Sequence, residues 1–499
     1  MLGYIASYSN NGDIYGGGTT QLISFPQSVG VIENGISGVN LGVISKINGE
    51  TFQHEWSSVF HAEETAHPLE IEPAPNGDLI ILFSSISTNF PTTGTIQGVN
   101  ILENAINYFL VRLDDNGALI WSYCVGSGGN GDYRSNFMFN SIHGSRNMGN
   151  FEQLSDPTKF LVSFATNDPT LFTSENAFIG DYNLPGNFDS ERSAYVAVVD
   201  IENLSLENAT YLSPDGIRTK PFDCKVLENG NFLVCGSFRG DYSLDFNCYQ
   251  NSNVDEKGAV VWVLNQDLSS LQTATLFDKV GSDLALAIDE SSLGQIIVNI
   301  LTETPQLGAI GSYSVLNSHN NIIGFNSDLT EIDFSGTFGG AGEPGIVYAK
   351  AFLVDRCDKI YVSGNANFNS YTSEMNITPD AFTNQGGFYM ASFEPEMADI
   401  SFATLLGGNH TDGGISTYDE KGVVYQGVCS VLGDPFLTTD NAWDDSQLGV
   451  VELGLYKIDF QSDGAVSQFT TELNNPCAPV ELQLNNHSTL GEYQWFLDD

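Results

Sequence analysis

Residues 108–123 read Tyr108-Phe-Leu-Val-Arg-Leu-Asp-Asp-Asn-Gly-Ala-Leu-Ile-Trp-Ser-Tyr123. Two apolar runs flank Asp-Asn-Gly, and these turn residues between β-forming runs predict a β-hairpin. Including this one, the chain has seven hairpins of this kind, at 41–56, 108–123, 194–212, 259–276, 322–338, 388–405 and 453–469. A first hairpin precedes each of them, at 5–16, 69–83, 151–164, 224–236, 287–299, 352–364 and 416–426. The pair recurs roughly every sixty to eighty residues, which is typical of a repeat architecture.

The repeat predicts an all-β fold. Two hairpins supply four antiparallel strands, and seven repeats predict a seven-bladed β-propeller over residues 1–470, in which ring closure protects the sheet edges. We expect the ring to close by bringing the segment around Ile5 and the segment after Leu453 into one blade. Its core is expected to form from apolar strand faces, with no metal required for folding.

The charge balance restricts the possible partners. The chain has 17 Lys and Arg against 62 Asp and Glu, a formal net charge of −45. Nucleic acid and anionic membrane surfaces are disfavoured, because both recruit clustered Lys and Arg. No apolar stretch approaches the ~18 residues of a membrane span, so membrane insertion is not expected. The acidity fits either a self-repelling solvated surface or the binding of cations.

Several stretches resemble a known repeat. They are Asn89-Phe-Pro-Thr-Thr-Gly94, Ile377-Thr-Pro-Asp-Ala-Phe-Thr383, Trp121-Ser-Tyr-Cys-Val-Gly-Ser-Gly-Gly-Asn-Gly-Asp132 and Ser335-Gly-Thr-Phe-Gly-Gly-Ala-Gly-Glu343. Together they are similar to the bacterial SBBP-type β-propeller repeat, with its proline-containing loop and closing Gly-Gly segment. The resemblance covers nearly the whole chain and is loosest around 187–194.

The last residues resemble a different module. Cys477-Ala-Pro-Val480 and Tyr493-Gln-Trp-Phe-Leu-Asp498 are similar to the opening strands of a PKD-like immunoglobulin-type sandwich, predicted as a truncated domain at 471–499. Propellers joined to PKD-like domains are typical of secreted Bacteroidetes proteins. That resemblance implies an extracellular, cell-surface location, contact with the type IX secretion translocon and association with gliding motility. Met1 opens directly on a predicted strand without a signal peptide, so we expect the chain to be an internal portion of a longer product.

Candidate chemical sites are few. The sequence has neither an H-E-x-x-H metal motif nor a G-x-S-x-G nucleophile motif, so no catalytic or cofactor-binding residue is predicted. His61 and His67 flank Glu63 and Glu64, a spacing too loose to specify a metal. Oxygen-rich loops make weak calcium candidates, although the same residues are common in turns without an ion. These candidates are Asp114, Asp115, Asp132, Asp440, Asp444 and Asp445.

The cysteines leave one pairing open. If Asn229-Gly230 forms a two-residue turn, Cys224 and Cys235 lie directly opposite each other on adjacent strands. Facing positions come close to disulfide geometry, so a disulfide is possible, and two buried thiols are the alternative. Cys477 is expected to pair with a residue beyond Asp499.

Three classes of function remain open. The first is a non-enzymatic surface module that binds a glycan or protein ligand, or that assembles with other proteins, through loops on one face of the ring. The second is a glycan-binding or glycan-cleaving propeller, which needs paired carboxyl groups and exposed aromatic rings. The third is a passenger or accessory partner of the type IX translocon. We favour the first class.

Overall fold

The computed structural model describes most of the chain. The described residues are 2–8, 12–20, 41–62, 66–74, 76–130, 149–182, 184, 192–214, 216–245, 247–253, 257–279, 281–303, 312–342, 345–366, 375–384, 386–406, 412–418, 423–431, 438–439, 442, 451–459, 469–473 and 482–486.

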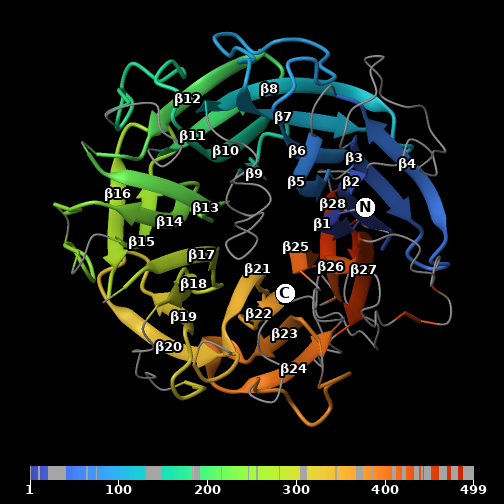
Figure 1. Cartoon of the computed structure of the whole chain (residues 1–499), viewed down its shortest axis with the longest axis vertical. Helices are drawn as coiled ribbons and strands as arrows, with labels where there is room; N and C mark the ends of the chain where they lie inside the picture. Colours follow the sequence, from blue (N-terminus) through green and yellow to red (C-terminus); the bar gives the residue numbers. More distant parts are fainter. Residues whose placement is uncertain are drawn as a thin grey trace.

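The strands are arranged as sheets around a central axis (Figure 1). Five sheets, which we call blades, have four antiparallel strands each, and the first strand of each is nearest the axis. These strands are β5 (Ala66–Pro73), β6 (Leu79–Ser85), β7 (Ala105–Leu113), β8 (Leu119–Asn130), β9 (Asn150–Gln153), β10 (Lys159–Thr166), β11 (Ser193–Asp200), β12 (Ser205–Tyr211), β13 (Arg218–Val226), β14 (Phe232–Arg239), β15 (Lys257–Leu264), β16 (Leu271–Phe277), β17 (Asp283–Glu290), β18 (Ile296–Thr302), β19 (Asn320–Phe325), β20 (Ile332–Phe338), β21 (Val347–Val354), β22 (Ile360–Ala366), β23 (Phe388–Phe393) and β24 (Ile400–Leu406).

The sixth sheet of the ring combines the first four strands of the chain with three strands from its last hundred residues. Its order is β27-β26-β25-β1-β2-β3-β4. The strands are β1 (Leu2–Tyr8), β2 (Ile14–Thr20), β3 (Leu41–Ile47), β4 (His54–Phe60), β25 (Asp412–Tyr418), β26 (Val423–Val431) and β27 (Val451–Asp459). A parallel pairing of Ile5 with Ile415 connects β1 to β25. The segment around Ile5 and the segment beginning at Val451 therefore share one sheet.

This arrangement corrects the predicted number of blades. The prediction of a seven-bladed propeller with separate four-stranded blades is wrong, because the described strands of the ring form six sheets, one of them seven-stranded. The cause is the approach of β1 to β25, because these two inner strands, which belong to different predicted blades, pair through their backbones. Hairpin counting could not detect a pairing between residues so distant in sequence.

The predicted start of a PKD-like sandwich is also not supported. In the described part of the tail, β28 (Phe469–Leu473) and β29 (Leu482–Asn486) form a two-stranded antiparallel sheet. A sandwich requires two packed sheets, and a lone hairpin does not supply them. Residues 474–481 and 487–499, including Cys477, lie outside the described residues. The boundary between 1–470 and 471–499 stays a prediction.

The long segment after the second strand of a blade covers that blade's outer strand. In the blade β9–β12, Ser174 N donates to Ala209 O at 3.1 Å and Tyr211 N donates to Ile179 O at 3.1 Å. The other four-stranded blades have such bonds too: Thr93 to Ser122, Leu276 to Gln250, Val315 to Thr337 and Thr378 to Ala403. Exposed strand edges invite intermolecular pairing, so these segments protect the rim of the ring.

The same segments also fasten each blade to the next. Phe178 N donates to Leu268 O in the β15–β16 turn at 2.9 Å. Leu268 is fully buried with φ 57°, a left-handed conformation that non-glycine residues seldom adopt. The equivalent bonds are Gln97 to Leu204, Tyr249 to Leu329 and Tyr313 to Met397, and each acceptor has a φ between 50° and 57°. The same type of backbone hydrogen bond therefore connects neighbouring blades at four successive junctions.

Apolar side chains between neighbouring blades form the core. Tyr108, Phe164 and Tyr195 pack in one such cluster, with Tyr108 and Phe164 stacked at 4.4 Å between ring centroids. Further clusters connect β9–β12 to β13–β16, β13–β16 to β17–β20, and β17–β20 to β21–β24. The ring is thus held by side-chain burial, the dominant favourable contribution to folding. The described part contains no helix long and apolar enough to span a membrane.

Candidate functional site

Polar side chains recur at one position of the inner strands. Glu70, Asn150 and Asp223 each stand four residues before the residue whose N–H closes the following turn, namely Ala74, Leu154 and Leu227. All three are nearly buried, with exposed fractions of 8%, 5% and 4%. We call this site on the strand the clasp position, because its side chain reaches the next blade.

The contacts at the clasp position are the same in three successive blades. Glu70 Oε2 accepts from Phe151 N at 2.8 Å, and Asn150 Oδ1 accepts from Cys224 N at 3.2 Å. Asp223 Oδ2 accepts from Ile288 N at 3.1 Å. An inner strand is the edge of its sheet, so its outward N–H groups lack a ladder partner. The preceding blade supplies one through a side chain, which removes the cost of burying an unpaired N–H.

The pattern shifts by two residues at the following blade. Ala287 occupies the clasp position of β17 and has no polar atom on its side chain. Two residues later, Asp289 Oδ2 accepts from Val354 N of β21 at 2.8 Å. The junction therefore keeps a carboxylate-to-backbone bond although the residue that makes it has moved.

A row of charged side chains lies two residues beyond the clasp position. Its members on four successive inner strands are Glu72, Glu152, Lys225 and Asp289. Lys225 Nζ lies 3.4 Å from Glu152 Oε2. The negative charge of Glu152, followed by those of Asp289, Asp223 and Glu72, outweighs desolvation and raises the pKa of Lys225. The charge of this one ammonium group is thus stabilised by several carboxylates.

Burial disfavours the ionised forms of these acids. It raises the pKa of Glu70 to about 8, with the Phe151 N–H bond opposing the rise and the charge of Asp223 adding to it. Burial, followed by the charge of Glu152, raises the pKa of Glu72. The pKa of Asp289 rises to about 6, again mainly by burial, while Lys225 opposes the rise. The inner wall therefore holds carboxyl groups that take up protons near neutral pH.

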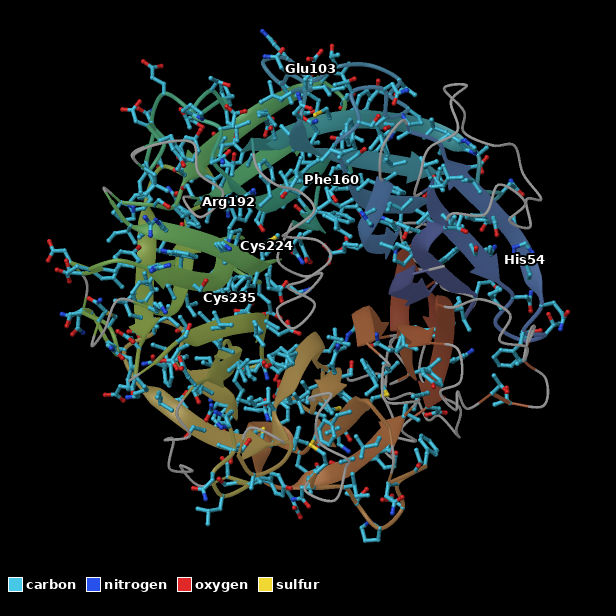
Figure 2. All side chains as sticks on the ribbon, viewed as in Figure 1. His54, Glu103, Phe160, Arg192, Cys224 and Cys235 are labelled. Atoms are coloured by element: carbon cyan, nitrogen blue, oxygen red, sulfur yellow. The ribbon has the colours of Figure 1, made fainter. Side chains whose placement is uncertain are left out.

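Cys224 and Cys235 do not form the suggested disulfide. Both are free thiols, and their strands pair Cys224 with Val234 and Asp223 with Cys235. The turn is longer than predicted, because Leu227 N bonds Asn231 O and three residues lie between them. A one-residue change in register sends facing side chains to opposite sides of a sheet. Cys224 packs toward β9–β12 and Cys235 toward β17–β20 (Figure 2).

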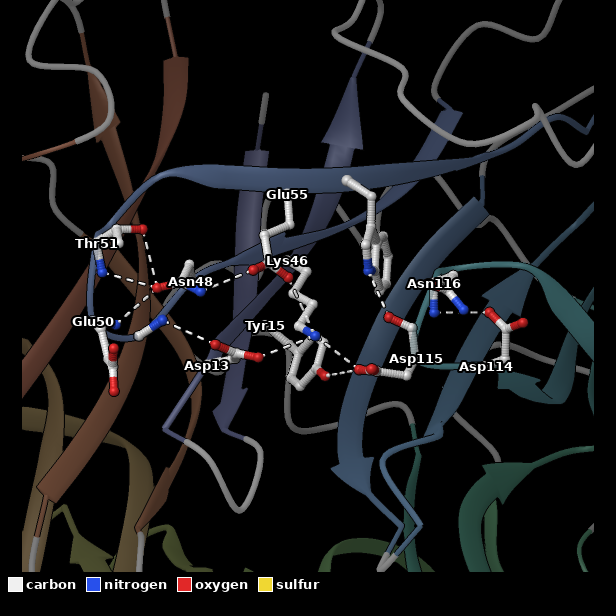
Figure 3. Close-up of polar contacts among 12 residues, drawn as sticks. Asp13, Tyr15, Lys46, Asn48, Glu50, Thr51, Glu55, Asp114, Asp115 and Asn116 are labelled. Atoms are coloured by element: carbon white, nitrogen blue, oxygen red, sulfur yellow. Dashed lines mark hydrogen bonds and ion pairs between the residues drawn. The ribbon is translucent and has the colours of Figure 1, made fainter.

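Asp114 and Asp115, two of the calcium candidates, both have protein partners. Asp114 Oδ1 accepts from Asn116 N at 2.9 Å and Ala118 N at 2.8 Å, the turn role weighed for these residues. Asp115 Oδ1 lies 2.7 Å from Lys46 Nζ (Figure 3). Asp132, Asp440, Asp444 and Asp445 lie outside the described residues.

Lys46 is the cation of a carboxylate cluster at the junction between β2–β4 and the β7–β8 turn. Besides Asp115, its Nζ lies 3.0 Å from Asp13 Oδ2 and 3.3 Å from Glu55 Oε2 (Figure 3). Tyr15 Oη donates to Asp115 Oδ1 at 3.3 Å. Burial alone would lower the pKa of Lys46, but hydrogen bonds to Asp115 and Asp13 outweigh it and raise the pKa. The ammonium group therefore lies within ion-pair distance of three carboxylates.

Metal ligands do not converge within the described part of the chain. No group there of three or more His, Cys, Asp or Glu residues has the geometry to hold an ion. His67 is buried, and burial lowers its pKa to about 3, so it is neutral at physiological pH. Glu63 and Glu64, its proposed companions, are not among the described residues.

The clasp position was missed from the sequence. No role was predicted for Glu70, Asn150 or Asp223. A signal did exist, because an acidic or amide residue recurs four residues before the turn in three consecutive repeats. Aligning the repeats on their turns would have revealed it, whereas the partner N–H groups belong to other blades and are invisible to any single hairpin.

Comparisons with known proteins add little beyond the fold. No protein-family model and no curated protein matches the sequence. Among solved structures, hydrazine synthase of Kuenenia stuttgartiensis is 9% identical, with a TM-score of 0.44, covering 85% of this chain and 92% of that one. The Dos1 propeller is 8% identical, with a TM-score of 0.41 and coverage of 87% and 90%. The β-propeller domain of the Trilobed protease from Pyrococcus furiosus is 10% identical, with a TM-score of 0.41 and coverage of 90% and 99%.

The class of protein therefore follows from the strand order. Antiparallel sheets set radially around an axis, with their inner strands linked blade to blade, define a β-propeller.

Proposed function

We propose that this propeller is a non-enzymatic module for binding, adhesion or assembly. The observation that carries the proposal is the clasp position, where the acidic side chains Glu70 and Asp223 are used to hold neighbouring blades together. A ring fastened in this way is a stiff support for its loops. Binding loops on a rigid scaffold lose less entropy when a ligand orders them.

The proposed setting is the outside of a bacterial cell. It rests on the resemblance of the Pro-containing loops and Gly-Gly segments to SBBP-type repeats, and implies export by a type IX secretion system and a link to gliding motility. The net charge of −45 suits a surface that repels its own copies. The module would meet the translocon during export and its ligand, a surface glycan or a protein, afterwards.

Two experiments test this function. A glycan array with the purified chain should identify bound sugars that are recovered without cleavage, and turnover of a bound glycan would contradict the non-enzymatic assignment. Fractionation of cells with and without a working type IX system should find the protein outside only when the system works. Cytoplasmic retention in both strains would contradict the export assignment.

A glycan-cleaving propeller is the second candidate, and one observation favours it. Glu72 and Glu152 stand on neighbouring inner strands, and the charge of Glu152 helps to raise the pKa of Glu72. Glycoside hydrolysis uses two carboxyl groups, one of which has a raised pKa and acts as the acid. This candidate predicts hydrolysis of an aryl glycoside that Glu72→Gln and Glu152→Gln each abolish. Absence of turnover by the unaltered protein removes it for the substrates tried.

A further inference from the structure

The seven-stranded sheet of the ring ends on one side at β27. In each four-stranded blade the third strand pairs with a fourth on its outer side, and in the seven-stranded sheet β3 pairs with β4 in the same way. Among the described strands, β27 pairs only with β26. The edge strand of a sheet presents a row of backbone N–H and C=O groups with which a further strand can pair. The outer edge of β27 is therefore a place where this sheet can gain a strand.

Burial distinguishes β27 from the other strands that pair with a fourth. In β3, β7, β11, β15, β19 and β23 every residue is buried except the charged Arg112 and Lys257. In β27 the uncharged residues Leu455 and Tyr456 are half-buried. A fourth strand adjoins the third in each of the other cases. A neighbour of the same kind would therefore bury apolar surface on β27, which is favourable.

Phe382 is a second, independent sign at the same place. It follows Thr378 by four residues, as Phe178 follows Ser174, and Thr378 and Ser174 both donate to the outer strand of their own blade. Phe178 N donates to Leu268 O, in the turn between the third and fourth strands of the next blade, and the Phe178 ring packs against that blade. Phe382 is 60% exposed. A turn that leads from β27 into a further strand is the element that would cover it.

The chain itself contains a strand at the right distance from β27. Elsewhere in the ring the fourth strand begins five to seven residues after the third one ends. β27 ends at Asp459, and the following Asp463-Gly464 is a turn signal. A further strand would thus begin at about residue 465, and β28 (Phe469–Leu473) falls within its span. The ten residues from Asp459 to Phe469 can extend over about 33 Å, several times the spacing of paired strands.

The partner of β28 in this structure gives it little stabilisation. β28 and β29 pair at five positions and form a sheet of two strands. A two-stranded hairpin is marginally stable at best in water, because it has no further strand or layer against which to bury a face. β27 belongs to a larger sheet, which packs against the blade β21–β24 through Val424 and Ile458. Pairing with β27 therefore offers β28 the larger stabilisation.

We propose that the outer edge of β27 is a docking site for a β-strand and that its occupant is β28 of the same chain, which exchanges between β29 and β27. Docking makes β28 the eighth strand of this sheet and brings a turn over Phe382. Recognition is by backbone hydrogen bonds, as in the addition of a peptide strand to a sheet edge. The inference is independent of the proposed function, because it concerns how the sheet is completed and not which ligand the ring binds.

Hydrogen exchange of the β27 amides tests the docking site with two double variants. One carries Thr470→Pro and Thr471→Pro in β28, and the other carries Leu484→Pro and Asn485→Pro in β29, the residues that pair with Thr471 and Thr470. Adjacent prolines remove N–H groups from both edges of a strand, so each variant disrupts the β28–β29 pairing. Only the β28 variant also prevents docking on β27. The β27 amides should therefore exchange roughly tenfold or more faster in the β28 variant than in the β29 variant.

The amides of β3 are the internal control, because β4 occupies the outer edge of β3. The measured quantity is the change in β27 relative to β3, so a general loss of stability does not imitate the expected result. Three outcomes overturn the proposal: equal exchange of β27 in the two variants, faster exchange in the β29 variant alone, or protection of β27 that grows with protein concentration. The last would assign the edge of β27 to a strand from a second copy of the chain.

Discussion

Asp223 shows how one side chain connects two neighbouring blades. Its carboxylate binds the N–H of Ile288 in the next blade, and its backbone pairs with Cys235 in its own. Glu70 and Asn150 do the same at the two preceding junctions. The chemistry of these residues is that of a capped strand edge: an acceptor is provided for a donor that would otherwise be buried without one.

Replacement of Asp223 by Ala should lower the free energy of unfolding by about 1–3 kcal/mol, because it leaves the Ile288 N–H unpaired. Denaturant titration measures this loss. Asp223→Asn is the control, since its amide oxygen can still accept the bond and should retain most of the stability. Equal loss in both variants would show that charge, and not the acceptor, is what matters.

The raised pKa of Glu70 predicts that the free energy of unfolding falls as pH rises. Its pKa is raised to about 8 in the folded protein, against 4.5 in the unfolded chain, so the folded state binds more protons between these values. The free energy of unfolding should therefore be highest near pH 4.5 for this group and decline up to about pH 8. Asp289, raised to about 6, adds to the decline at its lower end.

Glu70→Gln separates this effect from other titrations. The amide keeps an acceptor for Phe151 N but cannot ionise. Denaturation from pH 5 to pH 9 should show a shallower decline for the variant than for the unaltered protein. Parallel curves for the two proteins would refute the assignment of the pH dependence to Glu70.

At the scale of elements, the junction between β2–β4 and the β7–β8 turn depends on one lysine. Lys46 and Asp13 are both only 5% exposed in their side chains, while Asp115 is 57% exposed. Coulomb attraction is stronger where water is excluded, so the Lys46–Asp13 pair matters more than the outer contact. Three carboxylates from different elements are held together by this single charge.

Lys46→Met should destabilise the protein by roughly 3 kcal/mol, because it leaves Asp13 buried without its cation. Thermal unfolding measures the effect. The half-exposed pair of Lys359 and Glu394 offers a comparison, since Lys359→Met should cost less than about 1 kcal/mol. A similar loss in both variants would show that burial of the lysine is not decisive.

At the scale of the molecule, the ring is assembled from apolar clusters between blades and from bonds between strand edges. Neither requires a ligand. We predict that EDTA shifts the melting temperature by no more than about 2 °C, a change equivalent to roughly 2 kcal/mol for a chain of this size. A larger drop that calcium restores would show that acidic loops bind an ion that contributes to stability.

The sequence alone determined the all-β class, the hairpins and their turns, because alternation of apolar residues and Asn-Gly or Asp-Asn-Gly turns are local signals. The β7–β8 hairpin was predicted from Tyr108 to Tyr123 and lies there. Only the tertiary structure decided how the sheets are counted and what the carboxylates do. The pairing of Ile5 with Ile415 and the bond from Asp223 to Ile288 join residues of different repeats, and no pattern within one repeat records its neighbour. The register of Cys224 depended on one extra turn residue, and such a shift reverses which side of a sheet every side chain occupies.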